Sequence, residues 1–255
     1  MRVTFLGTGT SHGVPMIGCD CSVCTSSDPR NNRMRSSIMI EHEEALYVID
    51  TGQEFRLQAL RARIKHLDAV FYTHDHADHI YGIDDLRVFS AHSPLPVYGA
   101  AALLMQIKKR FSYIFTSSHP GGGVPTLDLR PIDEKGCTFG NLFVQAIPIY
   151  HGRQVIYGYR FGDMAYLTDC SGIPQSSLKL LQGLDVLIIG ALRYSAHPTH
   201  FSVSDAVATI ESLQPKRGYL THMCHQLDHE ALRAILPEGI EPAYDGLQVT
   251  LPLEE

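Results

Sequence analysis

A histidine-rich heptapeptide occupies positions 73–79 and reads Thr73-His74-Asp75-His76-Ala77-Asp78-His79. It contains four side chains of the kinds that bind metal ions in proteins: His74, His76, Asp78 and His79. Zinc, manganese and iron accept imidazole nitrogens and carboxylate oxygens as ligands. The apolar run before the heptapeptide is typical of a buried strand, so we expect a tight loop that follows a strand. In such a loop the first two side chains would bind one metal ion and the last two a second.

The composition indicates an ordinary globular protein. The chain has 255 residues, of which 44% are hydrophobic and 19% charged, and this suits a single domain over 1–255. The net charge of −6 gives no broad attraction for nucleic acid. No apolar run is long enough to span a membrane. The segment Met1–Gly7 enters a strand with no signal-peptide pattern ahead of it, which predicts a cytoplasmic protein.

Three cysteines lie close together at Cys19, Cys21 and Cys24. Thiols at this spacing are typical of a zinc site that lacks its fourth ligand. The candidates for the fourth ligand are Cys224 and His225, far along the chain. A zinc ion with four protein ligands has no open position, so this site would be structural. It would tie the N-terminal loop to the C-terminal part of the protein.

A glycine-rich loop, Gly7–Pro15, follows the first expected strand. Its glycines would let the backbone approach a ligand closely, with amides free to hold an anion. His12 in this loop could reach a phosphate, although a lone histidine in a loop is more often merely exposed. The segment Ser117–Pro125 is rich in glycine and predicts a mobile flap.

The remaining pattern indicates alternating strands and helices. The expected strands are Val3–Leu6, Ser37–Glu41, Ala45–Ile49, Pro96–Gly99, Leu142–Pro148, Ile156–Phe161, Ala165–Leu167, Val186–Ile189 and Arg217–Leu220. The expected helices are Phe55–Ile64, Ala100–Phe115, Val203–Leu213 and His229–Leu236. Ser202 and Asp205 have the spacing of a capping box. Several other histidines and aspartates directly follow these strands, where an open α/β sheet binds its ligands.

The pattern His-x-His-x-Asp-His after an apolar strand resembles the signature of the metallo-β-lactamase superfamily. This resemblance implies an αββα sandwich, in which two mixed β-sheets are flanked by helices. It also implies the metal ligands. His74, His76 and His151 would hold one metal ion, and Asp78, His79 and His222 the other. Asp169 would bridge the two ions, and Asp50 would orient a ligand through a hydrogen bond.

The resemblance also favours one kind of chemistry. Superfamily members that hydrolyse β-lactams typically have cysteine where this chain has Asp169. A bridging carboxylate instead suits two closely spaced metal ions that activate one water for in-line attack at phosphorus. Asp78, Asp169 and His200 are the expected catalytic residues. In the phosphodiesterase branch of the superfamily, a histidine in the region that corresponds to Leu192–Ser204 protonates the leaving oxygen. His200 is our first candidate for this role, with His197 second.

The closest resemblance is to the PhnP-type phosphoribosyl cyclic phosphodiesterases, and it covers nearly the whole chain. It rests on Leu6–Gly9, Gly18–Cys24, the metal-binding heptapeptide, Thr221–Gln226 and Asp245-Gly246. It implies His225 as the fourth ligand of the structural zinc. The implied cofactors are two divalent ions, zinc, manganese or iron, and one structural zinc. The implied substrate is a small cyclic or nucleotide-like phosphodiester of the phosphoribosyl 1,2-cyclic phosphate type.

Three alternatives stay open. A tRNA 3′-processing nuclease shares the ligand set, but it needs a basic RNA-gripping arm, and no Lys/Arg-rich insertion is evident. A carboxylic ester or thioester hydrolase would use the same activated water on a carbonyl carbon. A non-catalytic zinc-dependent binding protein would keep the ligands without turnover. We expect neither a nucleic-acid nor a membrane partner, and the surface near the flap could support a homodimer.

Overall fold

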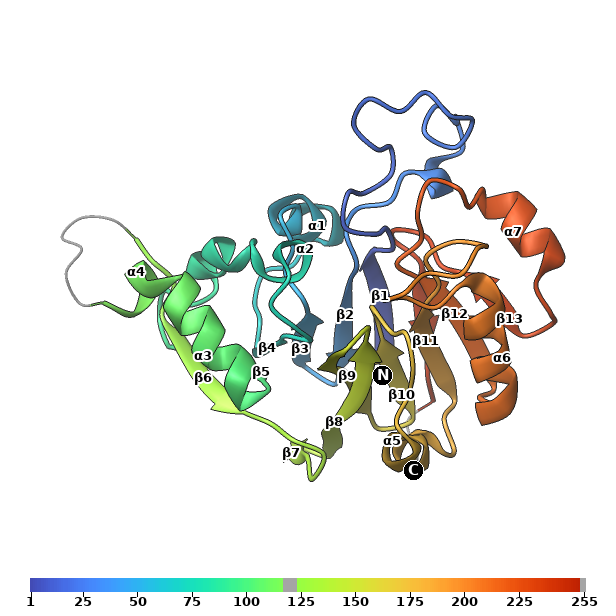
Figure 1. Ribbon diagram of the computed structural model, residues 1–255. Coiled ribbons are helices and arrows are strands. Elements are labelled where there is room, and N and C mark those ends of the chain that lie inside the picture. The colour runs from blue at the N-terminus through green and yellow to red at the C-terminus, as the bar shows by residue number, and fades with distance from the viewer. Residues whose placement is uncertain (117–122, 253–255) are drawn as a thin grey trace.

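The computed structural model describes residues 1–116 and 123–252, and its elements form two facing β-sheets (Figure 1). Both sheets have seven strands, in the orders β14-β1-β2-β3-β4-β5-β6 and β13-β12-β11-β10-β9-β8-β7. Each sheet is mixed. In the first, the pairs from β14 to β3 are antiparallel and those from β3 to β6 are parallel. In the second, β7 to β10 pair antiparallel and β10 to β13 parallel.

Within each sheet, most neighbouring strands are also consecutive in the chain. The first sheet contains β1 Arg2–Gly7, β2 Ser37–His42, β3 Ala45–Ile49, β4 Ala69–Phe71, β5 Leu95–Gly99, β6 Leu127–Pro131 and β14 Gln248–Thr250. The second contains β7 Cys137–Phe139, β8 Leu142–His151, β9 Gln154–Phe161, β10 Met164–Leu167, β11 Val186–Gly190, β12 Arg217–Thr221 and β13 Ile240–Pro242. Thus β14, the last strand, returns to pair with β1, the first.

The helices cover the outer faces of the two sheets. Beside the first sheet lie α1 Phe55–Ala62, α2 Ala77–Ile80, α3 Ala101–Arg110 and α4 Ser112–Phe115, with the 3-10 turn η2 Ile83–Val88. Beside the second lie α5 Gln175–Leu178, η3 Lys179–Leu181, α6 Val203–Leu213 and α7 His229–Ile235. A further 3-10 turn, η1 Pro29–Asn31, belongs to the long loop after β1. No helix in the described part of the chain is long and apolar enough to cross a bilayer.

Three apolar layers hold this arrangement together. The central layer is packed from both sheets, with Phe71 of β4 against Tyr159 and Phe161 of β9 at ring-centroid distances of 5.3 and 5.0 Å. Two outer layers lie between each sheet and its helices. Burial of apolar surface on both faces of both sheets explains why the strands read as nearly continuous apolar runs. The expected αββα sandwich of two mixed sheets is confirmed.

Local chemistry explains where several helices begin and end. In the capping box of α6, Ser202 accepts a hydrogen bond from the Asp205 backbone at 3.3 Å, and the Asp205 carboxylate accepts one in return at 3.0 Å. This feature was expected. The single helix expected over Ala100–Phe115 was wrong, because the backbone at Phe111 leaves the helical region and separates α3 from α4. The expected helix Phe55–Ile64 ends early, since Arg63 adopts a left-handed conformation.

The heptapeptide also differs from expectation. It is not a plain loop, because its second half forms the short helix α2, in which Ile80 donates a backbone hydrogen bond to His76 at 3.2 Å. The turn of helix places the His79 ring beside that of His74, with ring centroids 4.2 Å apart. Most of the flap expected at Ser117–Pro125 falls on residues 117–122, outside the described residues.

Candidate metal centre

The expected metal ligands gather at one edge of the two sheets. Each follows or ends a strand: His74 and His76 after β4, His151 at the end of β8, Asp169 after β10 and His222 after β12. Asp78 and His79 reach the same place from α2. This convergence results from the shared direction of the parallel strands, whose carboxyl ends meet at one edge.

The ligand atoms form two overlapping groups. One comprises His74, His76, His151 and Asp169, and the other comprises Asp78, His79, Asp169 and His222. Within each group, the ligand atoms all lie within 4.8 Å of one another. These are the two sets that the family resemblance implies, and each could hold a metal ion. Asp169 belongs to both.

The carboxylate of Asp169 lies between the two groups. Its Oδ1 is 3.2 Å from Nε2 of His79 and 3.1 Å from Nδ1 of His222. Its Oδ2 faces the other group, 3.8 Å from Nε2 of His74. Because each oxygen is directed at a different group, the carboxylate is placed to bridge two cations.

Two buried nitrogens support the fit to metal ions. Nε2 of His74 and Nε2 of His79 are shielded from solvent, and neither has a contact with hydrogen-bond geometry within the described residues; Nε2 of His79 instead faces carboxylate oxygens of Asp78 and Asp169, each at 3.2 Å. Buried polar atoms in native proteins almost always have a partner. Both nitrogens belong to the groups defined above, and a divalent cation would satisfy them.

Hydrogen bonds on the far side of the rings fix their orientation. The carboxylate of Asp50 accepts from Nδ1 of His79 at 2.7 Å, as expected from the sequence, and from the backbone of Thr73 at 2.9 Å. His151 donates from Nδ1 to the carbonyl of Thr199 at 2.8 Å. In both rings the bond occupies Nδ1 and leaves Nε2 for a metal, which is the usual way that proteins orient metal-binding histidines.

Three site residues have unusual backbone conformations. Asp50, Asp169 and His222 have φ values of 62°, 54° and 57°, in the left-handed region. This conformation costs about 1–3 kcal/mol for a residue other than glycine. Each residue follows a strand, and the left-handed turn directs its side chain into the site. Such strain persists where the surrounding structure fixes it, and it is concentrated at functional sites.

The site combines carboxylates and imidazoles in a buried environment. Burial alone would raise the pKa of Asp169, but His222 and His79 beside it hold that pKa well below its ordinary value. Burial alone would lower the pKa of His79, yet Asp169, Asp78 and Asp50 together raise it well above the usual range. Positive charge is therefore favoured at this place. Metal ions would supply that charge, and their binding would release protons.

His200 lies at the entrance to the site. Its Nδ1 is 3.9 Å from Oδ2 of Asp169, and its ring stacks on His222 at a centroid distance of 5.0 Å. Burial and the neighbouring His222 lower the pKa of His200 to about 3, so the ring is neutral near neutral pH. The alternative candidate, His197, packs against His200, with the centroids of the two rings 5.1 Å apart. Its Nδ1 is 3.2 Å from the hydroxyl of Thr199.

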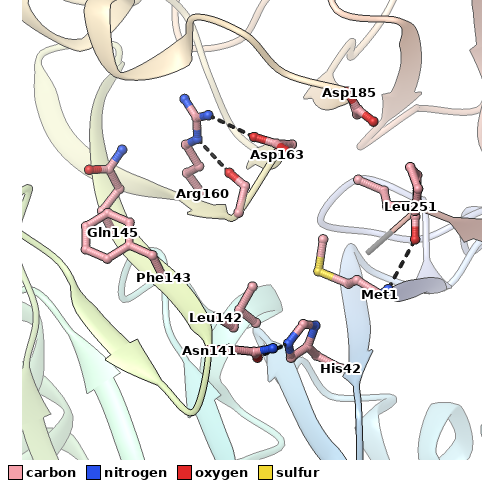
Figure 2. Close-up of a pocket in the computed structure, with 12 residues that line it drawn as sticks. Met1, His42, Asn141, Leu142, Phe143, Gln145, Arg160, Asp163, Asp185 and Leu251 are labelled. Carbon is pink, nitrogen blue, oxygen red and sulfur yellow. Dashed lines mark hydrogen bonds and ion pairs between the residues drawn. The ribbon is translucent and has the colours of Figure 1, made fainter. Parts of the chain in front are cut away.

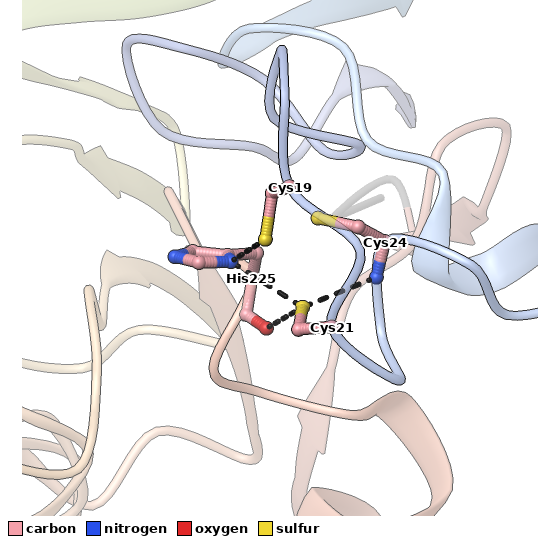
Figure 3. Close-up of side chains that lie close together, drawn as sticks. All are labelled: Cys19, Cys21, Cys24 and His225. Carbon is pink, nitrogen blue, oxygen red and sulfur yellow. Dashed lines mark hydrogen bonds between the residues drawn. The ribbon is translucent and has the colours of Figure 1, made fainter.

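The cysteine cluster forms a separate site (Figure 3). Sγ of Cys19 and Sγ of Cys21 lie 3.2 and 3.4 Å from Nδ1 of His225, and Cys24 completes the group. The backbone N–H of Cys24 and the ring of His225 lower the pKa of the Cys21 thiol to about 6, which favours the thiolate that binds metal. These four residues could hold a tetrahedral zinc ion.

Cys224, the other candidate for the fourth ligand, is not part of this group. Its sulfur accepts a hydrogen bond from the backbone of Gln226 at 3.4 Å, and its carbonyl accepts one from Arg33 at 3.2 Å. Sequence reasoning missed Arg33, which is 1% exposed and also donates to the carbonyl of Leu227 at 2.7 Å. It thereby fixes the turn that carries His225. Nothing in its sequence neighbourhood distinguishes it from a surface arginine.

Another cavity lies at the opposite edge of the sheets, and Figure 2 shows the residues that line it. It has a volume of about 460 Å³ and is lined by Met1, His42, Asn141 and Arg160, among others. Its one arginine is already engaged, since Arg160 donates to the carbonyl of Gly162 at 2.7 Å and contacts Asp163 at 3.3 Å. None of the metal-binding groups lines it. Among the described residues, the candidate metal ligands therefore lie at the other edge of the sheets, away from this cavity.

Comparison with known proteins agrees with this geometry. Over residues 46–223 the sequence matches the family described as "Beta-lactamase superfamily domain". A diphosphatase of the PhnP family, known from its crystal structure, is 42% identical, with a TM-score of 0.92. That match covers 99% of this chain and 98% of the diphosphatase.

Curated proteins are also similar to the chain. An octanoyltransferase of Porphyromonas gingivalis is 38% identical over 98% of this chain, and the match covers 52% of that protein. A ribonuclease Z of Listeria welshimeri is 30% identical, and the match covers 96% of this chain and 97% of that protein. The chain spans about half or less of the length of the first curated relatives that it matches. On these matches, and on the site that accompanies them, the chain belongs to the β-lactamase superfamily and, within it, to the PhnP family.

Proposed function

We propose that this protein is a metal-dependent hydrolase that cleaves a P–O bond in a small phosphodiester. The observation that carries this proposal is the position of Asp169, whose two oxygens face two separate groups of metal ligands. A carboxylate shared in this way would hold two cations close together. That spacing suits attack at phosphorus, where both the attacking and the leaving oxygens need stabilisation.

The chain supplies the ligands and the proton-transfer groups of this reaction. Two divalent ions bound here would polarise the phosphoryl oxygens and lower the pKa of a water. His74, His76 and His151 with Asp169 would hold one ion, and Asp78, His79 and His222 with Asp169 the other. His200 faces the same space, and an anionic phosphoryl group beside its ring favours the protonated form. We assign to it the transfer of a proton to the leaving oxygen.

The proposed cofactors are two zinc, manganese or iron ions in this site and a third, structural zinc at the Cys19-Cys21-Cys24-His225 group. The donor set does not select among the first three metals, because imidazole and carboxylate suit all of them. Thiolates at the second site favour zinc. The single domain over 1–255, the cytoplasmic location and the homodimer stay predictions.

The proposed substrate has a phosphorus atom with two bridging oxygens. A phosphoribosyl 1,2-cyclic phosphate has this character, and so does the α phosphorus of an organic diphosphate ester; the similar PhnP-family protein is described as a diphosphatase. In both, one oxygen must leave as the water attacks. Small size is favoured because the net charge of −6 gives no broad attraction for RNA.

The test is turnover of bis(p-nitrophenyl) phosphate by protein loaded with zinc, manganese or iron. We expect activity that falls at least about 100-fold in Asp169→Asn, because the shared ligand is weakened. His92→Gln, at an exposed histidine remote in sequence from the ligands, is the matched control. No turnover with any of the three metals would overturn the proposal. For His200→Gln, a substrate with an alkoxide leaving group is needed, since nitrophenolate leaves without a proton.

Two rival activities are supported by names among the relatives. The octanoyltransferase suggests acyl chemistry at a carbonyl carbon, and the ribonuclease Z suggests RNA cleavage. The same preparation should therefore be offered an octanoyl thioester and a tRNA precursor with a 3′ extension. A kcat/KM on either that exceeds the value on small phosphodiesters would replace the leading proposal. Metal binding without turnover of any of these substrates would favour the binding protein.

A further inference from the structure

An apolar groove of about 640 Å³ lies between α1 and η2, on the helical side of the first sheet. Apolar side chains of α1, of η2 and of the residues that directly follow each of them line it: Phe55, Ala59, Leu60, Ile64, Val88 and Phe89. No member of the two metal groups or of the cysteine site, all of which lie in the described part of the chain, lines this groove. The groove is therefore separate from the proposed chemistry, and its volume lies in the range of small-molecule sites.

The groove has a buried aromatic floor and exposed aliphatic edges. Phe55 is 0% exposed, and the centroid of its ring lies 6.3 Å from that of Phe89. Leu60 and Val88 are 61% and 69% exposed. Aliphatic side chains so open to water are stabilised when an apolar ligand covers them. The floor is continuous with the apolar layer under the helices, and this combination is typical of a site for an apolar chain.

The charged side chains that line this groove are mostly cations. Arg56, Arg63, Lys65 and Arg87 line it, against one carboxylate, that of Asp85. This excess of positive charge is opposite in sign to the net charge of −6 on the whole chain. Within residues 1–116 and 123–252, the side chains of Arg56, Arg63 and Lys65 make neither an ion pair nor a hydrogen bond.

Two acids that lie next to the groove in the sequence are already engaged. Glu54 forms an ion pair with Arg35. Asp84 accepts a hydrogen bond from the Tyr113 hydroxyl at 2.9 Å and faces Arg87 at 3.5 Å. These acids are thus not available to the other three cations of the groove. Uncompensated cations beside an apolar floor attract an anion that carries an apolar chain.

We propose that this groove binds a single-chain carboxylate of the fatty-acid type. Its alkyl chain covers the aromatic floor and the exposed Leu60, and its carboxylate lies between Arg63 and Lys65. These two cations flank Ile64 just after α1, so they lie at one end of the apolar stripe of that helix. A cationic amphiphile would be repelled by this end, and a neutral one would leave both cations unpaired. A polyanion without an apolar chain would not use the aliphatic lining.

Calorimetric titration of the zinc-loaded protein with octanoate, decanoate and dodecanoate, each below its critical micelle concentration, tests the groove. We expect an affinity that rises about 2–4-fold with each added methylene, the upper value for a fully buried one, and no binding of dodecyltrimethylammonium. Leu60→Asp should weaken dodecanoate binding at least about 10-fold, because apolar contact is lost and a like charge is added. Leu57→Asp is the matched control, since Leu57 is a 49% exposed leucine of the same helix that does not line the groove. It should leave the affinity unchanged.

A pair of double variants tests the position of the carboxylate. Arg63→Gln with Lys65→Gln removes the two cations at the end of the groove. Lys108→Gln with Lys109→Gln removes two exposed cations of α3 that do not line it. The first pair should weaken dodecanoate binding about 10-fold, since interactions with a charged group are lost, and the second should not. Thermal unfolding of each variant verifies that the fold is kept.

The proposal is overturned if dodecanoate does not bind, or if neither Leu60→Asp nor the Arg63 and Lys65 double variant weakens its binding more than the matched control does. Flotation with vesicles of anionic phospholipid separates a dissolved ligand from a membrane surface. Binding to such vesicles without binding of dissolved dodecanoate would also overturn the proposal, because the groove would then be part of a membrane-contacting face. None of these measurements depends on turnover, so their failure leaves the proposed hydrolase activity unaffected.

Discussion

Replacing Asp50 by asparagine keeps the size of this side chain but converts one acceptor oxygen into an NH2 donor. Asp50 is 0% exposed. Its Oδ1 accepts from the Thr73 backbone at 2.9 Å, and its Oδ2 accepts from the Thr73 hydroxyl at 2.8 Å and from Nδ1 of His79 at 2.7 Å. In Asp50→Asn the NH2 group would face Nδ1–H of His79. The ring must then move its hydrogen to Nε2, the atom directed at the metal-binding group.

The magnitude follows from the bond that is lost. A hydrogen bond to a charged group contributes about 1.5–3 kcal/mol, which corresponds to roughly 10–150-fold in an equilibrium constant. Loss of such an orienting partner typically costs roughly 10–100-fold in metal affinity. We therefore expect Asp50→Asn to weaken the Asp78-His79-Asp169-His222 group by about that factor. The His74-His76-His151-Asp169 group does not contain His79 and should change far less.

Competition with a chromophoric chelator, which resolves the two affinities, is the appropriate assay. The matched control is Asp245→Asn, another buried carboxylate, which accepts from the backbones of Thr8 and Met34 at 2.9 and 2.8 Å but belongs to neither metal group. It should lower stability and leave both metal affinities near their original values. If Asp50→Asn keeps both affinities within a factor of two, the argument from tautomer and orientation is refuted.

Three further predictions concern stability. A Cβ added at Gly52 would lie 2.2 Å from the Asp78 carbonyl, so Gly52→Ala should cost about 1–3 kcal/mol in urea unfolding. Gly123→Ala should cost much less, because no atom of the described residues would lie within 4 Å of the added Cβ. The hydrogen bond from the Ala231 N–H lowers the pKa of Asp228 in the folded protein. The ionised carboxylate therefore stabilises the fold above about pH 4, and this contribution is lost as the pH falls through the lowered pKa. Asp228→Asn should thus destabilise the protein at pH 7 but not near pH 2. Chelation of zinc should expose the 11–30 loop to trypsin, and unaltered cleavage would contradict a structural role.

Much of the metal centre could be expected from the sequence because its ligands are coded locally. The heptapeptide places four ligand side chains within one turn after a strand, and no long-range packing is needed to recognise them. The capping box of α6 is equally local, since Ser202 and Asp205 are separated by one helical turn. The αββα architecture followed from the family resemblance and from strand-like runs, whose apolar character reflects burial on both faces.

Tertiary structure decided the features that depend on distant segments. The carbonyl of Thr199 accepts a hydrogen bond from His151, and Arg33 donates one to the turn that carries His225. His222 follows β12, yet it lies in the same site as the histidines that follow β4. The break at Phe111 was not expected, although the aromatic and β-branched residues after it are weaker helix formers than those of α3. The contacts of His151, Arg33 and His222 each join residues far apart in the chain.

The sequence by itself therefore determined which atoms can bind metal, since ligand chemistry is a property of residue type and short spacing. Only the folded structure decided how those atoms are used. It directs the two oxygens of Asp169 at different groups and places His225, which the resemblance implied, beside the three cysteines and not Cys224. The physical reason is that bridging, tautomer choice and cavity shape depend on directions in space. Packing of the two sheets and the left-handed turns after their strands fix those directions.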